Sequence, residues 1–346
     1  ALIPISDTAL NLVNLGITLL LPPRVLPRLD HTRGIPEDAK TIVVVPVIFP
    51  DAASARAAID SLEIRYVANQ DENLYFAMLG DYADSTTATS QADQPILETL
   101  REGIADLNRR YSPDSPRFFL FQRRRLWNEA EGKWMGWERK RGKLHELNRF
   151  LRGSSDTSFE VSPTRNELFG EIRYVITLDA DTQLPRESAR KLVATILHPL
   201  NAPVLNRETR TVTHGYGILQ PRVSISLESS VRSVFSRIFS GHTGVDPYTT
   251  AVSDVYQDLF GAGIYTGKGL YCIDAFEKTL AQRVPENHVL SHDLFEGEFA
   301  RTALVSDIEF LDDYPLSYES FARRQHRWTR GDWQIASWIY SRSGNP

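Results

Sequence analysis

The sequence has almost no cysteine: Cys272 is the single cysteine among 346 residues. An intrachain disulfide is therefore excluded, and so is a zinc site built from several cysteine thiolates. Because chains of this kind are typical of reducing compartments, we expect the protein to face the cytoplasm.

An excess of positive charge is also lacking. The 39 Lys and Arg residues are outnumbered by 44 Asp and Glu residues, which gives a formal net charge of −5 at pH 7. Proteins that bind nucleic acids normally carry a basic excess, so nucleic acid is not an expected partner. The content of 42% hydrophobic and 24% charged residues is that of an ordinary folded protein.

The N-terminal apolar segment Ala9–Leu21 ends at two prolines and is too short to span a bilayer. It is either a helix packed on protein or a segment lying at a membrane interface, followed by the Pro-rich connector 22–36. The sequence begins without Met and stops soon after the apolar, aromatic stretch Trp333–Tyr340. We therefore expect it to be a fragment of a larger protein.

Strand-like runs alternate with helical patterns through the first half of the chain. The β-branched run Thr41–Val47 is typical of a central strand that is buried on both faces. Further strands are predicted at Leu74–Leu79, Arg117–Gln122 and Tyr174–Leu178, and helices at Ala52–Val67, Gln94–Tyr111 and Lys143–Leu151. The alternation predicts an α/β fold with a doubly wound, mixed and mostly parallel sheet flanked by helices.

Ligands of such sheets bind beyond the carboxyl ends of the strands. Asp81 follows the second predicted strand, and an Asp179-Ala-Asp181 motif follows the fourth. On an extended backbone residues i and i+2 project to the same side, where two carboxylates would repel unless a cation lay between them. Mg²⁺ or Mn²⁺ suits such a site, because these ions are held by one or two carboxylates plus substrate phosphates. The alternative is that Asp181 caps the following helix.

A second acidic motif occupies residues 291–297 (SHDLFEG). Asp293 is a candidate general base if it faces a pocket. The alternative is a plain helix start, capped by Ser291 and with acids in its first turn. His288 and His292 have metal-ligand spacing, but no third ligand is placed nearby.

Four arginines and two tryptophans gather in residues 323–333 (RRQHRWTRGDW). Guanidinium groups bind phosphate oxygens in a planar fork, and tryptophan rings stack on sugars. This composition favours a pyrophosphate or glycan contact over a solvated helix face.

Two glycine-containing segments are candidates for anion contacts. Gly142-Lys143 stands at a predicted helix start and could present N–H groups and an ammonium to an anion, although a basic loop before an amphipathic helix is the alternative. The segment Gly261–Gly269 (GAGIYTGKG) lacks the spacing of a phosphate loop, and Gly269 stands where Ser or Thr is required. We interpret its glycines as tight turns near a ligand.

Taken in order, these motifs resemble the family 2-like GT-A glycosyltransferases, which include cellulose synthase. The shared elements are the strand ending in Pro46, the Asp after the second strand, Gly142-Lys143 with Asn148, Asp179-Ala-Asp181, an acid at Asp293, and Arg324-Gln-His-Arg327-Trp328. A closer similarity is to the glycosyltransferase domain of bacterial cyclic β-1,2-glucan synthases. The stretches LLLPPRVLPRLD, RGKLHELNRFLRG, YVITLDADTQLP, GAGIYTGKGLYCIDAF, LSHDLFEG and RRQHRWTRGDWQ carry it over nearly the whole chain.

The resemblance implies a GT-A domain over residues 41–330, a membrane-proximal segment and linker over 1–40, and the start of another membrane-proximal segment over 331–346. It implies UDP-glucose as donor and inverting transfer onto a growing β-1,2-glucan, which the family builds on the protein itself. It also implies a bilayer contact through the larger protein at the cytoplasmic face of a bacterial inner membrane. Where related synthases carry Thr-Glu-Asp, this sequence has Ser291-His292-Asp293, which leaves Asp293 as the acid aligned with the base.

The resemblance also assigns roles to single residues. Asp179 and Asp181 would hold Mg²⁺ or Mn²⁺ against the UDP diphosphate, and Asp293 would take the proton of the acceptor hydroxyl. The implied donor-binding residues are Pro46, Asp81 (near the uridine), Lys143, Asp179 and Arg327, and the implied acceptor or glycan-binding residues are Arg324, Gln325 and Trp328.

Other functions fit parts of this pattern. A processive synthase of the cellulose or hyaluronan type would carry the same motifs with a different product linkage. A catalytically idle GT-A module would only bind glycan as a scaffold. A nucleotidyltransferase also needs paired carboxylates and a metal, but it would not explain the segment of arginines and tryptophans.

Overall fold

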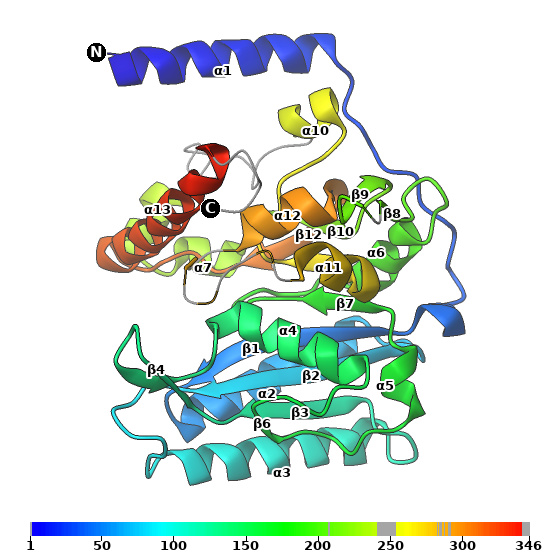
Figure 1. The fold of residues 1–346 in the computed structure, drawn as a ribbon, viewed down its shortest axis with the longest axis vertical. Helices are drawn as coiled ribbons and strands as arrows, with labels where there is room; N and C mark the ends of the chain where they lie inside the picture. Colours follow the sequence, from blue (N-terminus) through cyan, green and yellow to red (C-terminus); the bar gives the residue numbers. More distant parts are fainter. Residues whose placement is uncertain are drawn as a thin grey trace.

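The computed structural model describes residues 2–206, 208–240, 254–281, 283, 286, 288–289 and 292–340 (Figure 1). Its strands are β1 (Thr41–Phe49), β2 (Leu74–Tyr82), β3 (Phe118–Arg123), β4 (Leu126–Asn128), β5 (Lys133–Met135), β6 (Phe159–Val161), β7 (Tyr174–Thr177), β8 (Val204–Asn206), β9 (Thr211–His214), β10 (Ile218–Ile225), β11 (Gly269–Cys272) and β12 (Thr302–Asp312). Its helices are α1 (Leu2–Leu20), α2 (Ala52–Ala68), α3 (Asp93–Tyr111), α4 (Arg139–Leu151), α5 (Glu167–Glu171), α6 (Ser188–Ile196), α7 (Leu227–Val231), α8 (Val234–Phe239), α10 (Val255–Phe260), α11 (Ile273–Leu280), α12 (Asp293–Ala300) and α13 (Tyr318–Tyr340), with a 3₁₀ turn at Glu37–Ala39.

Eight strands form one mixed sheet in the order β12-β10-β11-β7-β1-β2-β3-β6. Strands β7, β1, β2 and β3 are mutually parallel, as are β10 and β12, whereas β11 and β6 run antiparallel to their neighbours. The predicted α/β class with a mostly parallel sheet is confirmed. Each of the four predicted strands and three predicted helices is present, within a few residues of its expected bounds.

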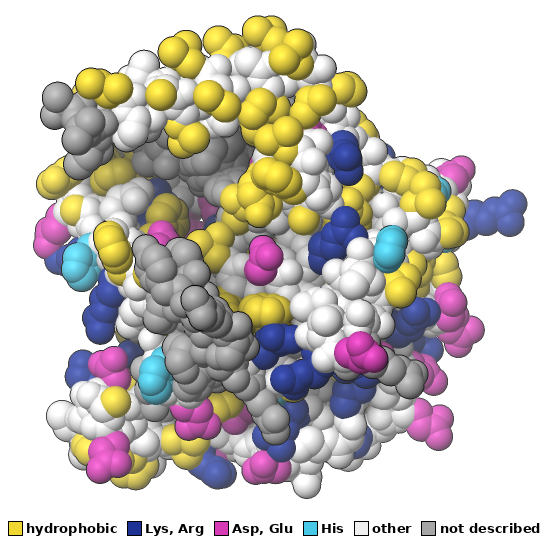
Figure 2. Space-filling view, turned by 45° about the horizontal axis from the view of Figure 1, so that its top comes forward, with side chains coloured by type: hydrophobic (Ala, Val, Ile, Leu, Met, Phe, Trp, Pro, Cys, Tyr) yellow, Lys and Arg dark blue, Asp and Glu magenta, His cyan; other side chains and the backbone are white. Residues whose placement is uncertain are grey.

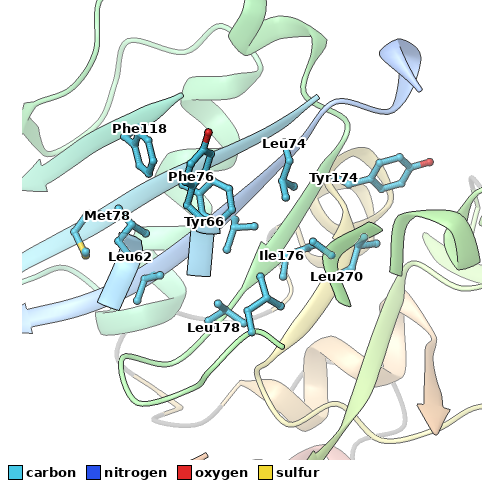
Figure 3. Packing of buried hydrophobic residues seen from close by; sticks show 14 of the residues in the cluster. Leu62, Tyr66, Leu74, Phe76, Met78, Phe118, Tyr174, Ile176, Leu178 and Leu270 are labelled. Atoms are coloured by element: carbon cyan, nitrogen blue, oxygen red, sulfur yellow. The ribbon is translucent and has the colours of Figure 1, made fainter. Parts of the chain in front are cut away.

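Pleating divides the residues of the central strands between two cores. Val43 and Val45 of β1 face one side, in a cluster with residues of α2, α3 and α6 (Figure 3). Ile42 and Val44 face the other side, in a cluster with residues of α4, α5 and α11. Since successive side chains on a strand point to opposite faces, an unbroken apolar run such as that of β1 is what a strand covered on both sides requires.

The strands of the second half bring distant segments to one edge of the sheet. Because β11 is antiparallel to β7, its beginning lies beside the end of β7, where Gly269 pairs with Thr177. The end of β12 lies there too, since Leu311 of β12 bridges to Gln183 in the segment after β7. The carboxyl edge of the sheet therefore gathers the residues after β7, before β11 and at the end of β12.

Helix α1 lies apart from the sheet, above α10 (Figure 1). Its apolar side chains are largely exposed, and they form much of the hydrophobic surface along the top of Figure 2. The exposed residues are Ile5, Leu10, Leu12, Val13, Leu15, Leu19 and Leu20. A helix buried in the protein is therefore excluded for this segment. Among the described residues, none of the helices has the combination of length and apolar character needed to traverse a bilayer.

Candidate active site at the carboxyl edge of the sheet

Asp179 stands two residues beyond the end of β7 and is held by two lysines. The Lys140 ammonium lies 2.5 Å from Oδ1, and the Lys268 ammonium lies 3.2 Å from Oδ2. Burial alone would raise the pKa of Asp179, but the two ammonium groups outweigh it and hold the pKa below its usual range. Asp179 is therefore an ionised carboxylate at the sheet edge.

Asp181 is exposed and lies in a turn rather than on an extended backbone. Thr182 donates its N–H to the Asp179 carbonyl (3.1 Å), so the expected extended Asp-Ala-Asp geometry is wrong. The capping alternative is wrong as well, because α6 begins at Ser188. Partial desolvation and the nearby carboxylates of Asp312 and Asp179 raise the pKa of Asp181, so the two aspartates of the motif interact although the backbone turns between them.

Asp312, the last residue of β12, is the neighbour that the sequence did not single out. The Thr182 hydroxyl donates to its Oδ1 at 2.6 Å, and the Lys268 ammonium pairs with its Oδ2. Gln183 bridges to Leu311 in the adjoining backbone, which fixes the Asp-Ala-Asp turn against the end of β12. A single acid at the end of a strand in the second half carries no signal of this contact.

The charges at this edge bear on the predicted divalent-cation site. Four carboxylates share the edge with three cationic groups: Asp179, Asp181, Asp293 and Asp312 with Lys140, Lys268 and Arg65, whose guanidinium donates to the Ala180 and Thr182 carbonyls. Within the described part of the chain, no three His, Cys, Asp or Glu side chains gather as a ready-made ligand set. Two carboxylates with surplus negative charge suit an ion that takes its remaining ligands from phosphates and water. Asp179 and Asp181 stay the predicted ligands.

Asp293, the predicted base, is the first residue of α12 and faces the same loop as Asp179. A side-chain carbon built at Gly267 would come within 2.8 Å of both Asp293 carboxylate oxygens, and the Gly267 carbonyl accepts from Lys140 at 2.7 Å. Burial raises the pKa of Asp293; Asp179 and Asp332 raise it further, while Lys140 opposes them. The expected cap Ser291 lies outside the described residues.

Two further groups on this helix start were not assigned from the sequence. Glu296 is buried one turn after Asp293, and its burial together with the Asp293 charge raises its pKa to about 8. His292 is buried with Nε2 3.8 Å from Glu138, and burial next to Arg141 lowers its pKa to about 3. His292 is therefore neutral, and its ring lies next to Glu138 at the start of α4.

The raised pKa of Glu296 predicts a pH dependence of stability. The charges of Asp293 and Glu277 raise the pKa of this carboxyl, and the cationic Arg141 and Lys140 lower it. Its folded pKa of about 8 exceeds the unfolded reference of 4.5, so the folded state binds the extra proton between these values. This contribution is fully present below about pH 4.5 and is lost as the pH rises through 8.

We expect the free energy of unfolding, measured by urea titration, to fall between pH 5 and pH 8.5. Glu296→Gln should flatten this dependence, because the amide stays neutral throughout. Glu298→Gln, an exposed neighbour on the same helix, should leave it unchanged. A wild-type protein that is equally stable at both pH values would contradict the buried neutral carboxyl.

Asp81 lies inside β2 and is part of a buried ion cluster. Arg123 donates from Nε to Asp81 Oδ1 at 2.7 Å and from Nη2 to Oδ2 at 2.9 Å. The Lys143 ammonium lies 3.1 Å from the same Oδ2. Lys143 also donates to the Val47 carbonyl (2.8 Å), and burial lowers the pKa of Lys143 to about 8. Next to that carbonyl, Pro46 is half-buried in β1. Contact of Asp81 and Pro46 with a uridine stays a prediction.

Arg123 fixes the start of α4 as well as Asp81. Its guanidinium donates to the Trp137 carbonyl (2.8 Å) and the Arg139 carbonyl (3.1 Å). In this segment Glu138 and Arg139 both have positive φ, at 49° and 50°. This backbone conformation is strained for residues other than glycine. Gly142 is required because a Cβ there would lie 2.0 Å from the Trp137 carbonyl oxygen. This turn positions Lys140 to pair with Asp179 and Lys143 to pair with Asp81.

The arginine–tryptophan segment lies on α13. Arg324 stacks on Trp328, with its guanidinium carbon 4.9 Å from the ring centroid, and it also covers Tyr314 at 5.5 Å. Arg327 is exposed and Gln325 half-buried. Asp332 contributes to the field at Asp293, which places the end of this segment near the predicted base. Phosphate and glycan contacts of these residues stay predictions.

By its fold and this arrangement of side chains, the chain is an α/β domain of GT-A-like architecture with an acid- and lysine-lined edge. The sequence is 50% identical over 341 residues, which is 98% of this chain, to the cyclic beta-(1,2)-glucan synthase NdvB of Rhizobium meliloti (strain 1021). The chain spans 12% of the length of that protein. No protein-family profile matches the sequence. The predicted resemblance is confirmed: the chain corresponds to a domain-sized part of that synthase.

Proposed function

We propose that this chain is a metal-dependent, inverting glucosyltransferase domain that extends a β-1,2-glucan from UDP-glucose. The relative is a cyclic beta-(1,2)-glucan synthase by name, and 341 aligned residues at 50% identity support a shared role for the matching part. The observation that carries the proposal is the shared loop: Asp293 packs on Gly267, and Lys140 joins the carbonyl of that glycine to Asp179. A base and a donor-phosphate site would thus lie side by side.

In the proposed reaction Asp293 accepts the proton of the acceptor hydroxyl. The acceptor oxygen forms a bond to the anomeric carbon on the face opposite the phosphate, and the bond to the phosphate oxygen breaks, so UDP leaves with the electron pair and the configuration inverts. A divalent ion bound by Asp179 and Asp181 would offset the charge on the diphosphate. The raised pKa of Asp293 suits this role, because a base works best with a pKa near the operating pH.

The remaining elements of the proposal concern the surroundings of the domain. The acceptor would be the growing glucan, and Trp328 would stack on it. The domain would work at the cytoplasmic face of a bacterial inner membrane, and the exposed apolar side chains of α1 fit a segment that is covered there.

Incubation of the 346-residue chain with labelled UDP-glucose, a β-1,2-glucan oligosaccharide and Mg²⁺ or Mn²⁺ tests this function. We expect UDP release together with new β-1,2 linkages, identified by linkage analysis of the product. A β-1,4 or β-1,3 product would instead indicate another processive synthase. UDP binding without UDP release would indicate an idle binding module.

Gly267→Ala should reduce turnover about 10–100-fold, because small misplacements of a catalytic group are costly. Gly267 has φ +82°, and an added methyl group would push the Asp293 carboxylate out of place. Gly132→Ala is the matched control: Gly132 also has positive φ (+63°), but nothing lies within 4 Å of the added carbon. Both variants should lose about 1 kcal/mol of stability from the left-handed backbone. Equal turnover of the two variants would contradict the contact.

A further inference from the structure

Lys268 is presented to the site by a turn that only glycines allow. Gly267 and Gly269 on either side of it have φ values of +82° and +143°, and a Cβ at Gly269 would lie 2.2 Å from the Leu219 carbonyl oxygen. Just before the turn, the Thr266 N–H and hydroxyl both donate to Gln220, at 2.9 and 3.0 Å, and Gln220 is fully buried. The turn is therefore fixed in the core rather than being a loose surface loop.

The sheet register explains where this turn points. Gly269 pairs with Thr177 across the antiparallel β11–β7 ladder, so the residues before β11 lie beside the residues after β7. Lys268 thus reaches both Asp179 and, across the end of β12, Asp312. Its side chain is 12% exposed, so this ammonium is enclosed by the carboxylates at the site.

Lys268 is surrounded by carboxylates, so it becomes available to an anionic ligand once a cation neutralises them. Of its two carboxylate partners, Asp179 is a predicted ligand of the divalent ion and Asp312 lies at the same edge. A bound ion would neutralise this negative charge, so the carboxylates would no longer require the Lys268 ammonium as a counter-ion. An ammonium on a flexible stem can then turn to phosphate oxygens, whose charge-assisted hydrogen bonds are the stronger kind.

We propose that Lys268 is a donor-binding residue: it serves as the resident counter-ion of Asp179 and Asp312 in the donor-free chain and pairs with the diphosphate of the bound nucleoside diphosphate. The proposal rests on the transferase function proposed above. It gives the Gly-Lys-Gly segment a specific ligand contact, whereas the sequence alone indicated only tight turns near a ligand.

The test compares three affinities of the 346-residue chain and of Lys268→Met. In calorimetry at saturating Mn²⁺, we expect the variant to bind UDP about 10–100-fold more weakly and uridine as the wild type does, because only the diphosphate contact is lost. Binding of Mn²⁺ alone, followed by electron paramagnetic resonance, should instead tighten by about tenfold, since a competing ammonium is gone. Opposite changes for UDP and for Mn²⁺ are not expected of a residue that only supports the fold.

Three variants keep the test interpretable. Lys268→Arg should retain UDP binding within about tenfold, because the charge remains. Lys268→Met with Asp312→Asn removes both members of an ion pair, leaves no newly unpaired carboxylate at 312, and should still bind UDP weakly. Lys191→Met, at an exposed position on α6, should match the wild type in all three affinities.

Unchanged UDP affinity in Lys268→Met would overturn the proposal, and so would a parallel loss of UDP and Mn²⁺ binding. A wild-type chain that binds no UDP at all would instead overturn the proposed function itself, and this inference with it.

Discussion

Asp293→Asn should lower the turnover of UDP-glucose by about 10²–10⁴-fold, which is the usual contribution of a general base. The amide keeps the shape of the side chain at the start of α12 but cannot accept the acceptor proton. Donor binding should survive, because Lys140 and Lys268 pair with Asp179 in the structure and not with Asp293. Steady-state UDP release gives the turnover, and calorimetry with UDP gives the affinity.

Asp274→Asn is a suitable control for this experiment. Asp274 also lies in the first turn of a short helix, α11, but it is exposed and pairs with Arg152. Its variant should turn over like the wild type. If Asp293→Asn keeps the wild-type rate, another group is the base.

Arg123→Met should reduce the free energy of unfolding by about 3–5 kcal/mol, the range found when one partner of a buried ion pair is removed. Arg123 is fully buried, and it is bonded to both oxygens of Asp81 and to Glu146 at 3.3 Å. Its loss would leave Asp81 with Lys143 as a cationic partner and would free the strained turn at Glu138 and Arg139. Denaturant titration measures the loss.

Two further variants serve as controls for this result. Arg109→Met removes an exposed ion pair with Asp106 and should change stability by no more than about 0.5 kcal/mol. Arg123→Met combined with Asp81→Asn should recover part of the loss, because the uncompensated charge is gone. An Arg123→Met protein within 1 kcal/mol of the wild type would show that the buried cluster does not hold this part of the fold.

Much of the first half of the fold could be predicted because its signals are local. The run Thr41–Val47 reads as a doubly buried strand from composition alone, and β1 is that strand. The strands β10 and β12 carry no comparable signal. They contain Arg222, Asp307 and Glu309, and their pairing depends on residues more than eighty positions apart. Sequence periodicity does not report such pairing.

The candidate site could be predicted only in part for the same reason. Acids that follow strands, such as Asp179, are recognisable, since parallel strands bring their ends to one edge. The partners of these acids are not. Lys140 arrives through a strained turn, Lys268 through an antiparallel strand in the second half, and Asp312 through a bulged pairing. The positions of all three residues depend on the tertiary fold and not on local sequence. The Gly-Lys-Gly spacing around Lys268 nevertheless indicated a tight turn.

We expect Asp179 and Asp181 to hold a divalent ion that receives the diphosphate of the donor. The most direct measurement is calorimetric titration of UDP into the wild-type chain and into Asp181→Ala, each with Mn²⁺ and each with a chelator. We predict that the wild type binds UDP only with Mn²⁺ and that Asp181→Ala binds in neither condition. Equal UDP affinity of the wild type with Mn²⁺ and with chelator, or of the variant and the wild type in Mn²⁺, would contradict the claim.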